Sequence, residues 1–461
     1  MSDVVYPEEL VYFIENIRPY QLHEVGNDKW LESHEMIIKL SQQAILEAAT
    51  HREESVKEHL ILREKLKILI HEAYCILLWK TKILPQILEI DPNPEATFLI
   101  YTVFFHEGSV ISLLETALFH QNGCASLKES SVDLVDYCAQ AIAQLIGLVS
   151  MGYHENETNI DVDESILTEM DRQKRDMLYK IGMRCISILN YLADNMDALP
   201  CSATRRMVTT HDIPWLLADL LSFCPWYRKT SKGIQKFIED KWTTVTGEDV
   251  TKVVKHEAQT WFCLRQILCN PSLMETYEMN DSRQKRLGQC QGLLHDTLLD
   301  QLPPLIELKH FLCTLSMGGG NNHQSSKKKS NLILEELPEI KENLIKEAKQ
   351  NGGYHVIAQN QSDTFLTTSK EKIYSLAQRL NSAYNTDLLA EMEANEESLS
   401  SVGKINDEKK CRICKKQAEK KCSKCKTIFY CSRQCQLDDW PSHKKKCITL
   451  ETTTKTTETA D

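Results

Sequence analysis

Seven cysteines and one histidine lie within residues 411–447, and they are the residues of this chain best suited to hold a metal. Their gaps of 2, 7, 2, 5, 3, 7 and 3 residues group them into four close pairs, each able to grip a metal from one tight turn. Four N or S donors close the shell of a structural Zn²⁺ and leave no open position for chemistry. Spacing alone does not say which pairs share a metal, but it predicts two Zn²⁺ per chain, with the ligands Cys411, Cys414, Cys422, Cys425, Cys431, Cys435, His443 and Cys447.

The ten other cysteines are scattered and show no paired spacing. Most stand among apolar residues, as small buried hydrophobic side chains do. Together with the thiolate cluster they favour a reducing compartment, either cytosol or nucleus. These cysteines are Cys75, Cys124, Cys138, Cys185, Cys201, Cys224, Cys263, Cys269, Cys290 and Cys313.

Catalytic motifs are harder to find. Residues 71–75, His-Glu-Ala-Tyr-Cys, imitate the zinc-protease pattern HExxH, but Cys75 replaces the second histidine. His106 and Glu107 fall inside an apolar helical stretch, where a structural pair is the simpler interpretation. Phosphate-binding, dinucleotide-binding and nucleophile-elbow motifs are missing. We therefore predict no catalytic residues and no small-molecule substrate.

The elements that precede the cluster are predicted to be helical. Strand signals are nearly absent from residues 1–316. Apolar residues repeat at helical spacing in several stretches, and Asp212 and Pro214 suggest an N-cap and first turn. Helices with such broad apolar stripes must bury one another. We expect an all-α protein with an irregular body resembling armadillo or HEAT stacks, although no clean 40-residue repeat is present. Two of the stripes are Ile100, Phe104, Ile111, Leu114 and Leu118, and Ile213, Leu216, Leu217, Leu220 and Leu221.

Composition divides the rest of the chain. Helices are predicted at Leu332–Lys349 and Thr368–Glu393, and the apolar face of the second needs a partner, either the body or another chain. The predicted order is a helical body at 1–316, a flexible linker at 317–330, helical segments at 331–394, a polar linker at 395–408, the cysteine-rich module at 409–448 and a disordered tail at 449–461.

Charge and hydropathy exclude other classes. The chain carries a net charge of −11, whereas 13 Lys or Arg and three acids give residues 409–447 a charge of +10, which leaves −21 for the remainder. An acidic body argues against nucleic-acid binding by the whole chain. The N-terminus lacks a secretory signal pattern, and the longest apolar stretch noted, Ala141–Met151, is shorter than a membrane span of about 20 residues.

The order and gaps of the eight ligands resemble the MYND zinc finger. The residues between them agree as well: Tyr430 precedes Cys431, Gln436 follows Cys435, and Trp440 stands before His443. The resemblance implies a cross-braced arrangement of the two metals. One site would hold Cys411, Cys414, Cys431 and Cys435, and the other Cys422, Cys425, His443 and Cys447.

MYND fingers that bind partners take short proline-rich peptides in a shallow groove. By this resemblance Ser423, Gln436 and Trp440 line the groove here. Tryptophan offers a flat apolar face to proline rings, which arrive already ordered in the polyproline II conformation. The alternative is that Trp440 belongs to the small core of the finger. Direct DNA recognition is less favoured, because the lysines flank metal-bound turns and do not line a recognition helix.

A resemblance also extends beyond the finger. A helical body, the stretch Leu298–Pro303, the run Leu334–Ile340 and a terminal MYND finger together resemble a family of axonemal dynein arm assembly factors. The resemblance implies a non-catalytic, cytoplasmic adaptor, concentrated near the centrosome or ciliary base. Its implied partners are a leucine-rich-repeat dynein assembly factor, Hsp90-type chaperone machinery and the dynein arm chains themselves.

Two other functions stay open at this level. Several MYND proteins are nuclear corepressors that bind proline-rich motifs, and Lys327–Lys329 is a possible nuclear signal. A lysine methyltransferase is the third possibility. In that class, however, the finger interrupts the catalytic domain, whereas here it closes the chain, and the cofactor-binding motif is missing.

Overall fold

The computed structural model describes residues 4–92, 94, 97–154, 165–231, 233–317, 335–366, 370–384, 413–414, 420–421 and 429–440. Most of both predicted linkers, the whole tail and five of the eight predicted ligands lie outside these residues. The chain forms two compact units, Met1–Tyr384 and Asn385–Asp461. The residues predicted as a body and the predicted helical segments up to Tyr384 thus belong to one unit.

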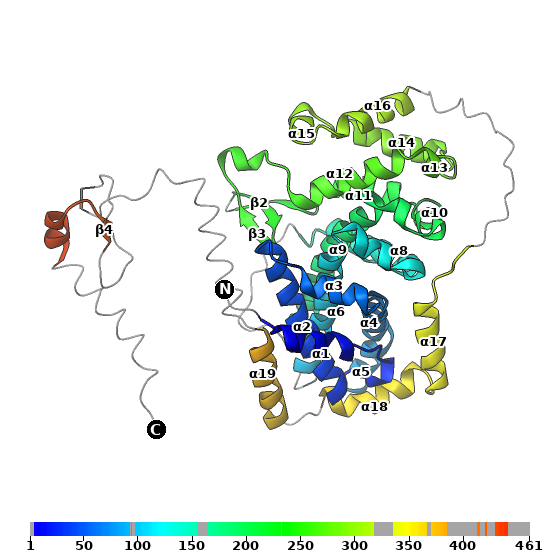
Figure 1. Ribbon diagram of the computed structural model, residues 1–461, viewed down its shortest axis with the longest axis vertical. Helices are drawn as coiled ribbons and strands as arrows, with labels where there is room; N and C mark the ends of the chain where they lie inside the picture. The colour runs from blue at the N-terminus through cyan, green and yellow to red at the C-terminus, as the bar shows by residue number, and fades with distance from the viewer. Residues whose placement is uncertain are drawn as a thin grey trace. The chain divides into compact units, whose positions relative to one another are not determined.

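Helices build the first unit, as Figure 1 shows, and they confirm the all-α prediction. Likeness to armadillo or HEAT repeats stays a prediction. The first helices are α1 (Pro7–Asn16), α2 (Asp28–Ala49), α3 (Ser55–Leu62), α4 (Leu66–Leu78), α5 (Leu84–Ile90), α6 (Phe98–Ala117), α7 (Gln121–Ser126), α8 (Ser131–Ser150) and α9 (Ile166–Asp194). They are followed by α10 (Cys201–Thr209), α11 (Ile213–Phe223), α12 (Lys255–Leu268), α13 (Pro271–Met274), α14 (Asp281–Gln291), α15 (Asp296–Gln301) and α16 (Leu305–Ser316).

Apolar stripes decide how these helices pack. The predicted stripe of α6 is buried throughout, and α6 packs between α2, α4 and α9. The long helix α9 in turn contacts α6, α8 and α12, so it lies at the centre of the unit. One continuous apolar core results, with buried residues from Val5 to Leu380. Because each helix buries its stripe only against its neighbours, the helices stabilise one another.

Some helices begin with a capping side chain, as local rules predict. Asn27 caps α2 and Asn280 caps α14, each accepting the N–H of the residue three positions on. Asp212 occupies the predicted N-cap position of α11, but its side chain makes no capping hydrogen bond. Its carboxylate instead accepts hydrogen bonds from the Tyr277 hydroxyl at 2.6 Å and from Arg283 Nε at 2.7 Å. A tertiary contact has taken the side chain that the local pattern assigned to the cap.

A small antiparallel sheet interrupts the helices, and the sequence analysis missed it. Its strands are β1 (Tyr227–Thr230), β2 (Gly233–Ile238) and β3 (Lys241–Thr244), paired in the order β1-β2-β3. The turn between β2 and β3 has positive φ at both Glu239 and Asp240, 50° and 59°. Such a turn is normally marked by Asn-Gly or Asp-Gly. Here the Asp240 carboxylate pairs with Arg184 of α9, so a tertiary contact supports a turn with no local signal.

The last helices of the unit return to its first part. They are α17 (Ile340–Gln350), α18 (Tyr354–Leu366) and α19 (Lys370–Tyr384), and they pack against α4, α5 and α2 respectively. Of the helix predicted at Leu332–Lys349, the described residues from 335 onward are helical only from Ile340, because Pro338 disfavours helical geometry before it. Asp133 of α8 then caps α17 by accepting the Ile340 N–H at 3.0 Å. The sequence did not predict α18.

Gln361 of α18 makes buried hydrogen bonds that connect α18 with the first part of the unit. Its carbonyl oxygen accepts the Trp79 indole N–H at 2.9 Å, and its NH₂ group donates to the carbonyls of Leu22 and Val25 at 2.9 and 3.1 Å. Phe365, one turn later, packs on Trp79. It also lies over Gly26, where a Cβ would approach its ring to 2.6 Å. Glycine is required there both by this contact and by a φ of +87°.

Two helices are longer and more apolar than the sequence analysis indicated. The helix α6 and the stretch Lys128–Ser150 reach a mean hydropathy of 1.3 and 1.4, so by length and composition alone they could cross a membrane. In the fold, 67% and 61% of their apolar windows are buried inside the protein. His106 and Glu107, which belong to α6, are also buried inside the protein. This packing is that of central core helices.

Replacing Gln361 tests the hydrogen bonds that connect α18 with the first part of the unit. Gln361→Ala leaves the Trp79 N–H and the Leu22 and Val25 carbonyls without their partner. We expect it to lower the free energy of unfolding by about 3 kcal/mol. Gln359→Ala, on the exposed side of the same helix, is the matched control and should change it by less than about 0.5 kcal/mol. Urea denaturation of the full chain, followed by circular dichroism, measures both, and equal effects would contradict the assignment.

A buried histidine makes the first unit sensitive to acid. His256 of α12 lies beneath the sheet, and burial, followed by the charge of Lys255, lowers its pKa to about 4. Because the unfolded chain keeps a pKa near 6.5, it binds the proton more tightly below that pH. The stability that neutral His256 contributes is therefore complete above pH 6.5 and is lost as the pH falls toward 4.

We expect this group alone to remove about 2 kcal/mol of stability between pH 7 and pH 5. His256→Met should flatten the dependence of thermal unfolding on pH in this range, measured by the helical circular dichroism signal of the full chain. A slope that is the same in both proteins would show that other groups control it.

Candidate metal centre

Three predicted ligands come together in the second unit. The Sγ atoms of Cys414 and Cys431 are 3.2 Å apart, those of Cys431 and Cys435 are 3.6 Å apart, and those of Cys435 and Cys414 are 3.9 Å apart. Among the described residues this is the one group of three or more His, Cys, Asp or Glu close enough to hold a metal.

These distances fit a zinc site. Four sulfur ligands at about 2.3 Å from a tetrahedral Zn²⁺ lie about 3.8 Å from one another. Three thiols brought this close without a disulfide between them are suited to hold a cation as thiolates. A bound metal would supply structural cross-linking if a fourth ligand, predicted to be Cys411, completed the shell and left no open position. The three residues belong to the site that the cross-braced arrangement assigns to Cys411, Cys414, Cys431 and Cys435.

Short elements place the three cysteines. Strand β4 (Lys420–Lys421) pairs with β5 (Phe429–Tyr430), and Cys431 follows β5 directly. A helix spans residues 433–440 and carries Cys435 in its first turn. Ser432 starts this helix, since its hydroxyl accepts the Cys435 N–H at 3.3 Å. The other predicted ligands, Cys411, Cys422, Cys425, His443 and Cys447, lie outside the described residues.

Two of the three predicted groove residues are described, while Ser423 is not. Gln436 and Trp440 lie four positions apart on the helix 433–440, so their side chains share one face. Both are half-buried. The geometry therefore places an amide and an indole beside each other on a partly exposed surface.

Sequence reasoning missed one buried pair in this unit. The Tyr430 hydroxyl donates to the Asp439 carboxylate at 2.6 Å, and both residues are buried. The sequence does not distinguish the buried Asp439 from Asp438 beside it, which is exposed.

The histidine and glutamate of the apparent HExxH motif, His71 and Glu72, serve structural contacts in the first unit, and His71 Nε2 lies 2.9 Å from the Tyr20 carbonyl oxygen. Glu72 Oε1 accepts the Tyr20 N–H at 2.8 Å, and its other oxygen faces His106 Nε2 at 3.4 Å. His106 Nδ1 lies 3.1 Å from His34 Nδ1. Burial, aided by the neighbouring His106, holds the pKa of His34 well below its usual value, so His34 is neutral. The side chains of Glu72, His106 and His34 are fully buried, so a substrate cannot reach them.

Glu107 is likewise part of the core. It pairs with Lys80, which lies in a π-helical turn at Trp79–Ile83, and it accepts the Tyr137 hydroxyl at 2.8 Å. Burial raises the pKa of Tyr137 well above its usual value, so it stays a hydrogen-bond donor. The predicted structural role of His106 and Glu107 is consistent with these contacts, and their burial is more complete than the sequence indicated.

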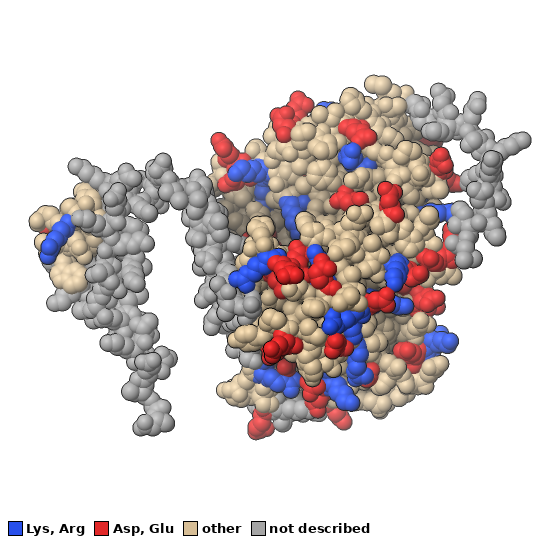
Figure 2. All heavy atoms as spheres, viewed as in Figure 1, with Lys and Arg blue, Asp and Glu red and all other residues tan. Residues whose placement is uncertain are grey.

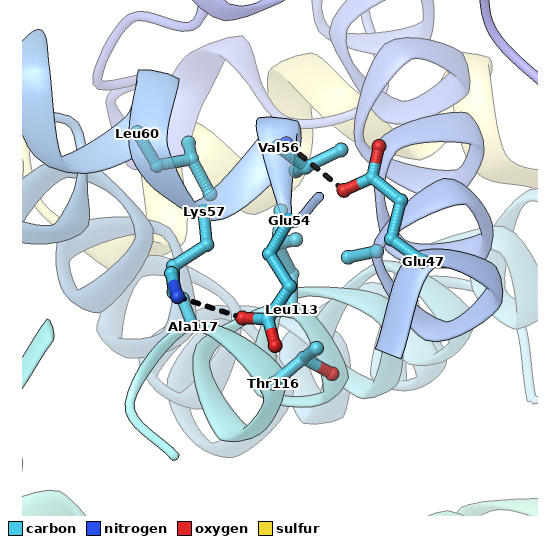
Figure 3. A pocket seen from close by; sticks show the side chains of 9 residues that line it. Glu47, Glu54, Val56, Lys57, Leu60, Leu113, Thr116 and Ala117 are labelled. Carbon is cyan, nitrogen blue, oxygen red and sulfur yellow. Dashed lines mark hydrogen bonds and ion pairs between the residues drawn. The ribbon is translucent and has the colours of Figure 1, made fainter. Parts of the chain in front are cut away.

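A shallow hollow between α2, α3 and α6 also contains carboxylates (Figure 3). Glu47 accepts the Val56 N–H at 3.1 Å, and Glu54 pairs with Lys57 at 2.8 Å. Burial by itself would raise the pKa of Glu54, but hydrogen bonds from Lys57 and His120 outweigh it and lower the pKa. Both carboxylates are therefore occupied by the protein itself and serve its packing.

The cysteines of the first unit behave as apolar side chains. Most are buried and all are free thiols. Burial raises the pKa of Cys224 to about 11 and that of Cys124 to about 12, so their nucleophilic thiolates are scarce. Figure 2 adds that Lys and Arg alternate with Asp and Glu over the visible face of this unit. The described residues on that face thus form no extended basic patch for a nucleic acid.

Comparison with known proteins agrees with these observations. The model of the MYND finger family matches residues 411–447. The chain is similar to the zinc finger MYND domain-containing protein 10 homolog of Drosophila melanogaster, with 57% identity over 457 residues. The alignment covers 97% of this chain and 100% of that relative. No solved structure matches the chain. A MYND finger implies zinc binding, in agreement with the three clustered thiols.

The zinc content can be measured directly. We expect two Zn²⁺ per full-length chain, and we expect Cys435→Ala to lose zinc while the first unit keeps its helical signal. Cys201→Ala, an exposed cysteine outside the cluster, is the matched control and should keep both metals. Elemental analysis together with circular dichroism checks this. A wild-type value near one would contradict the eight-ligand assignment.

Proposed function

The chain belongs to the zinc finger MYND domain-containing protein 10 family, and from this premise we propose that it is a non-catalytic adaptor for the preassembly of axonemal dynein arms. The observation that carries the proposal is the extent of the similarity, which spans the helical unit as well as the finger. A finger can be shared by proteins of many functions, whereas similarity over the whole length favours a common role. The resemblance to dynein arm assembly factors supplies the process.

The chemistry of the finger supports an interaction role. Its clustered thiols suit a structural metal, which contributes on the order of 10–16 kcal/mol to folding small modules. Such a metal produces a rigid surface without a large core. On that surface Gln436 and Trp440 present a hydrogen-bonding amide beside a flat ring, a pairing suited to an extended, proline-rich peptide.

The first unit supports an adaptor in a different way. Its buried ionisable clusters serve packing, as described for Glu72, His106 and Glu107. What it offers to other proteins is a large helical surface. We propose that this surface and the finger bring dynein arm chains together with a leucine-rich-repeat assembly factor and Hsp90-type chaperones. We propose the cytoplasm, near the centrosome or ciliary base, as the location.

Affinity purification of the full-length protein from ciliated cells, followed by mass spectrometry, tests the process. We expect dynein arm chains and assembly factors among the recovered proteins. Removal of the protein from such cells should leave axonemes with fewer dynein arms. Recovery of chromatin-bound transcription factors from the nuclear fraction would support the corepressor alternative, and intact arms after removal would contradict the proposal.

Trp440 tests whether the finger is the interaction surface. Trp440→Ala should keep zinc and weaken capture of the partner at least about thirtyfold, because an aromatic anchor often contributes about 2 kcal/mol or more. Gln436→Ala should weaken capture less, since it removes hydrogen bonds worth roughly 1 kcal/mol each. Gln434→Ala, which lies on the exposed side of the same helix, is the matched control.

Zinc content and partner capture together interpret the Trp440 result. Loss of zinc in Trp440→Ala would assign the indole to the core of the finger. Retention of both zinc and partner would move the interaction to another surface. If apolar stacking dominates, capture should change little as the salt concentration rises, whereas a contact made by lysines would weaken.

A further inference from the structure

The Tyr430–Asp439 hydrogen bond joins the two segments that carry Cys431 and Cys435. Tyr430 precedes Cys431 at the end of β5, and Asp439 lies one helical turn after Cys435. The hydroxyl donates to Asp439 Oδ2 at 2.6 Å. Only 1% of Tyr430 and 4% of Asp439 is exposed to solvent. The bond therefore closes a small loop around two of the three clustered thiols.

Burial makes this contact stronger than an ordinary surface hydrogen bond. A carboxylate taken from water needs partners inside the protein, and a bond to an ionised acceptor is roughly twice as strong as a neutral one. Breaking the bond leaves a buried oxygen without one of its donors. The helix 433–440 is thereby held at a fixed distance from the end of β5. The same two segments carry Cys431 and Cys435, whose sulfurs are 3.6 Å apart.

We propose that Tyr430 and Asp439 are positioning residues for the zinc site that contains Cys414, Cys431 and Cys435. They hold the thiols at ligand spacing before the metal binds and slow its release afterwards. Neither residue is itself a ligand in this arrangement. Residues that orient metal ligands in this manner typically change metal affinity by about 10–100-fold when replaced.

The inference rests on the proposed pair of zinc sites, and it is independent of the cellular role. It also predicts selectivity between the two sites. The pair supports segments that carry Cys431 and Cys435, whereas the second predicted site uses Cys422, Cys425, His443 and Cys447. Loss of the bond should therefore loosen one zinc and leave the other unchanged. A residue that merely belonged to a shared core would loosen both.

Zinc release from the full-length protein provides the test. A colorimetric chelator, 4-(2-pyridylazo)resorcinol, reports the rate at which each Zn²⁺ leaves. Tyr430→Phe keeps the ring and removes only the hydroxyl, so we expect one zinc to leave at least about tenfold faster and the other at the wild-type rate. Asp439→Asn should have a smaller effect on the same zinc, because the amide oxygen still accepts the bond without its charge.

Asp438→Asn is the matched control for Asp439→Asn. It makes the same change of charge one position away, on an exposed side chain that pairs with Gln434. We expect it to leave both release rates unchanged. Cobalt substitution identifies the weakened site, since an all-sulfur site and a site with one histidine differ in their absorption spectra.

Two outcomes would overturn the proposal. Unchanged release in Tyr430→Phe would show that the bond does not position the ligands, and equal acceleration of both metals would show a general role in the core of the finger. If Tyr430→Phe does not fold, the comparison of Asp439→Asn with Asp438→Asn decides, because equal rates in these two variants would overturn it as well. None of these measurements involves a partner protein, so they are independent of the test of cellular role.

Discussion

Mutual burial of apolar helix faces is the interaction on which this structure depends. Isolated helices shorter than about 12–15 residues are marginal in water, and in proteins most helical stability comes from packing of the apolar face. The helix α9 shows the consequence, because it is covered by α6, α8 and α12 at once. The same requirement brings α17, α18 and α19 back across the start of the chain. Their apolar faces and those of α4, α5 and α2 would otherwise be open to water.

Close packing of this kind forces polar groups into the interior, and the fold satisfies them over long distances in the sequence. Gln361 bonds to Trp79 and to carbonyls near residue 25, and Asp133 caps a helix that begins at Ile340. Glu107 binds both Lys80 and Tyr137. These bonds are directional, so they select one arrangement among the many that apolar contact alone permits. The ionisable residues that first suggested catalysis are used in this way.

The finger needs a different source of stability, because residues 411–447 are too few to form a large apolar core. Clustered thiols, a two-strand ribbon and one helix of residues 433–440 meet at a metal-binding geometry. The buried Tyr430–Asp439 bond adds the kind of directional contact that organises the first unit. One chain thus combines a unit stabilised by helix burial with a finger suited to stabilisation by metal.

The sequence by itself determined the helical class, the finger and the family, because each is written in local spacing. Apolar residues at helical intervals predict helices, and ligand gaps of two and three residues predict paired thiols. It could not predict the sheet, because the turn at Glu239 and Asp240 depends on Arg184, which lies 56 residues from Asp240. Nor could it predict α18, because the buried amide of Gln361 finds its hydrogen-bond partners, Trp79 and two backbone carbonyls, only in the folded chain. The missing side-chain cap at Asp212 has the same origin, because its carboxylate binds Tyr277 and Arg283 instead. Local pattern fixes which segments are helices, whereas the partners of buried polar side chains come from distant segments, and only the tertiary structure decides them.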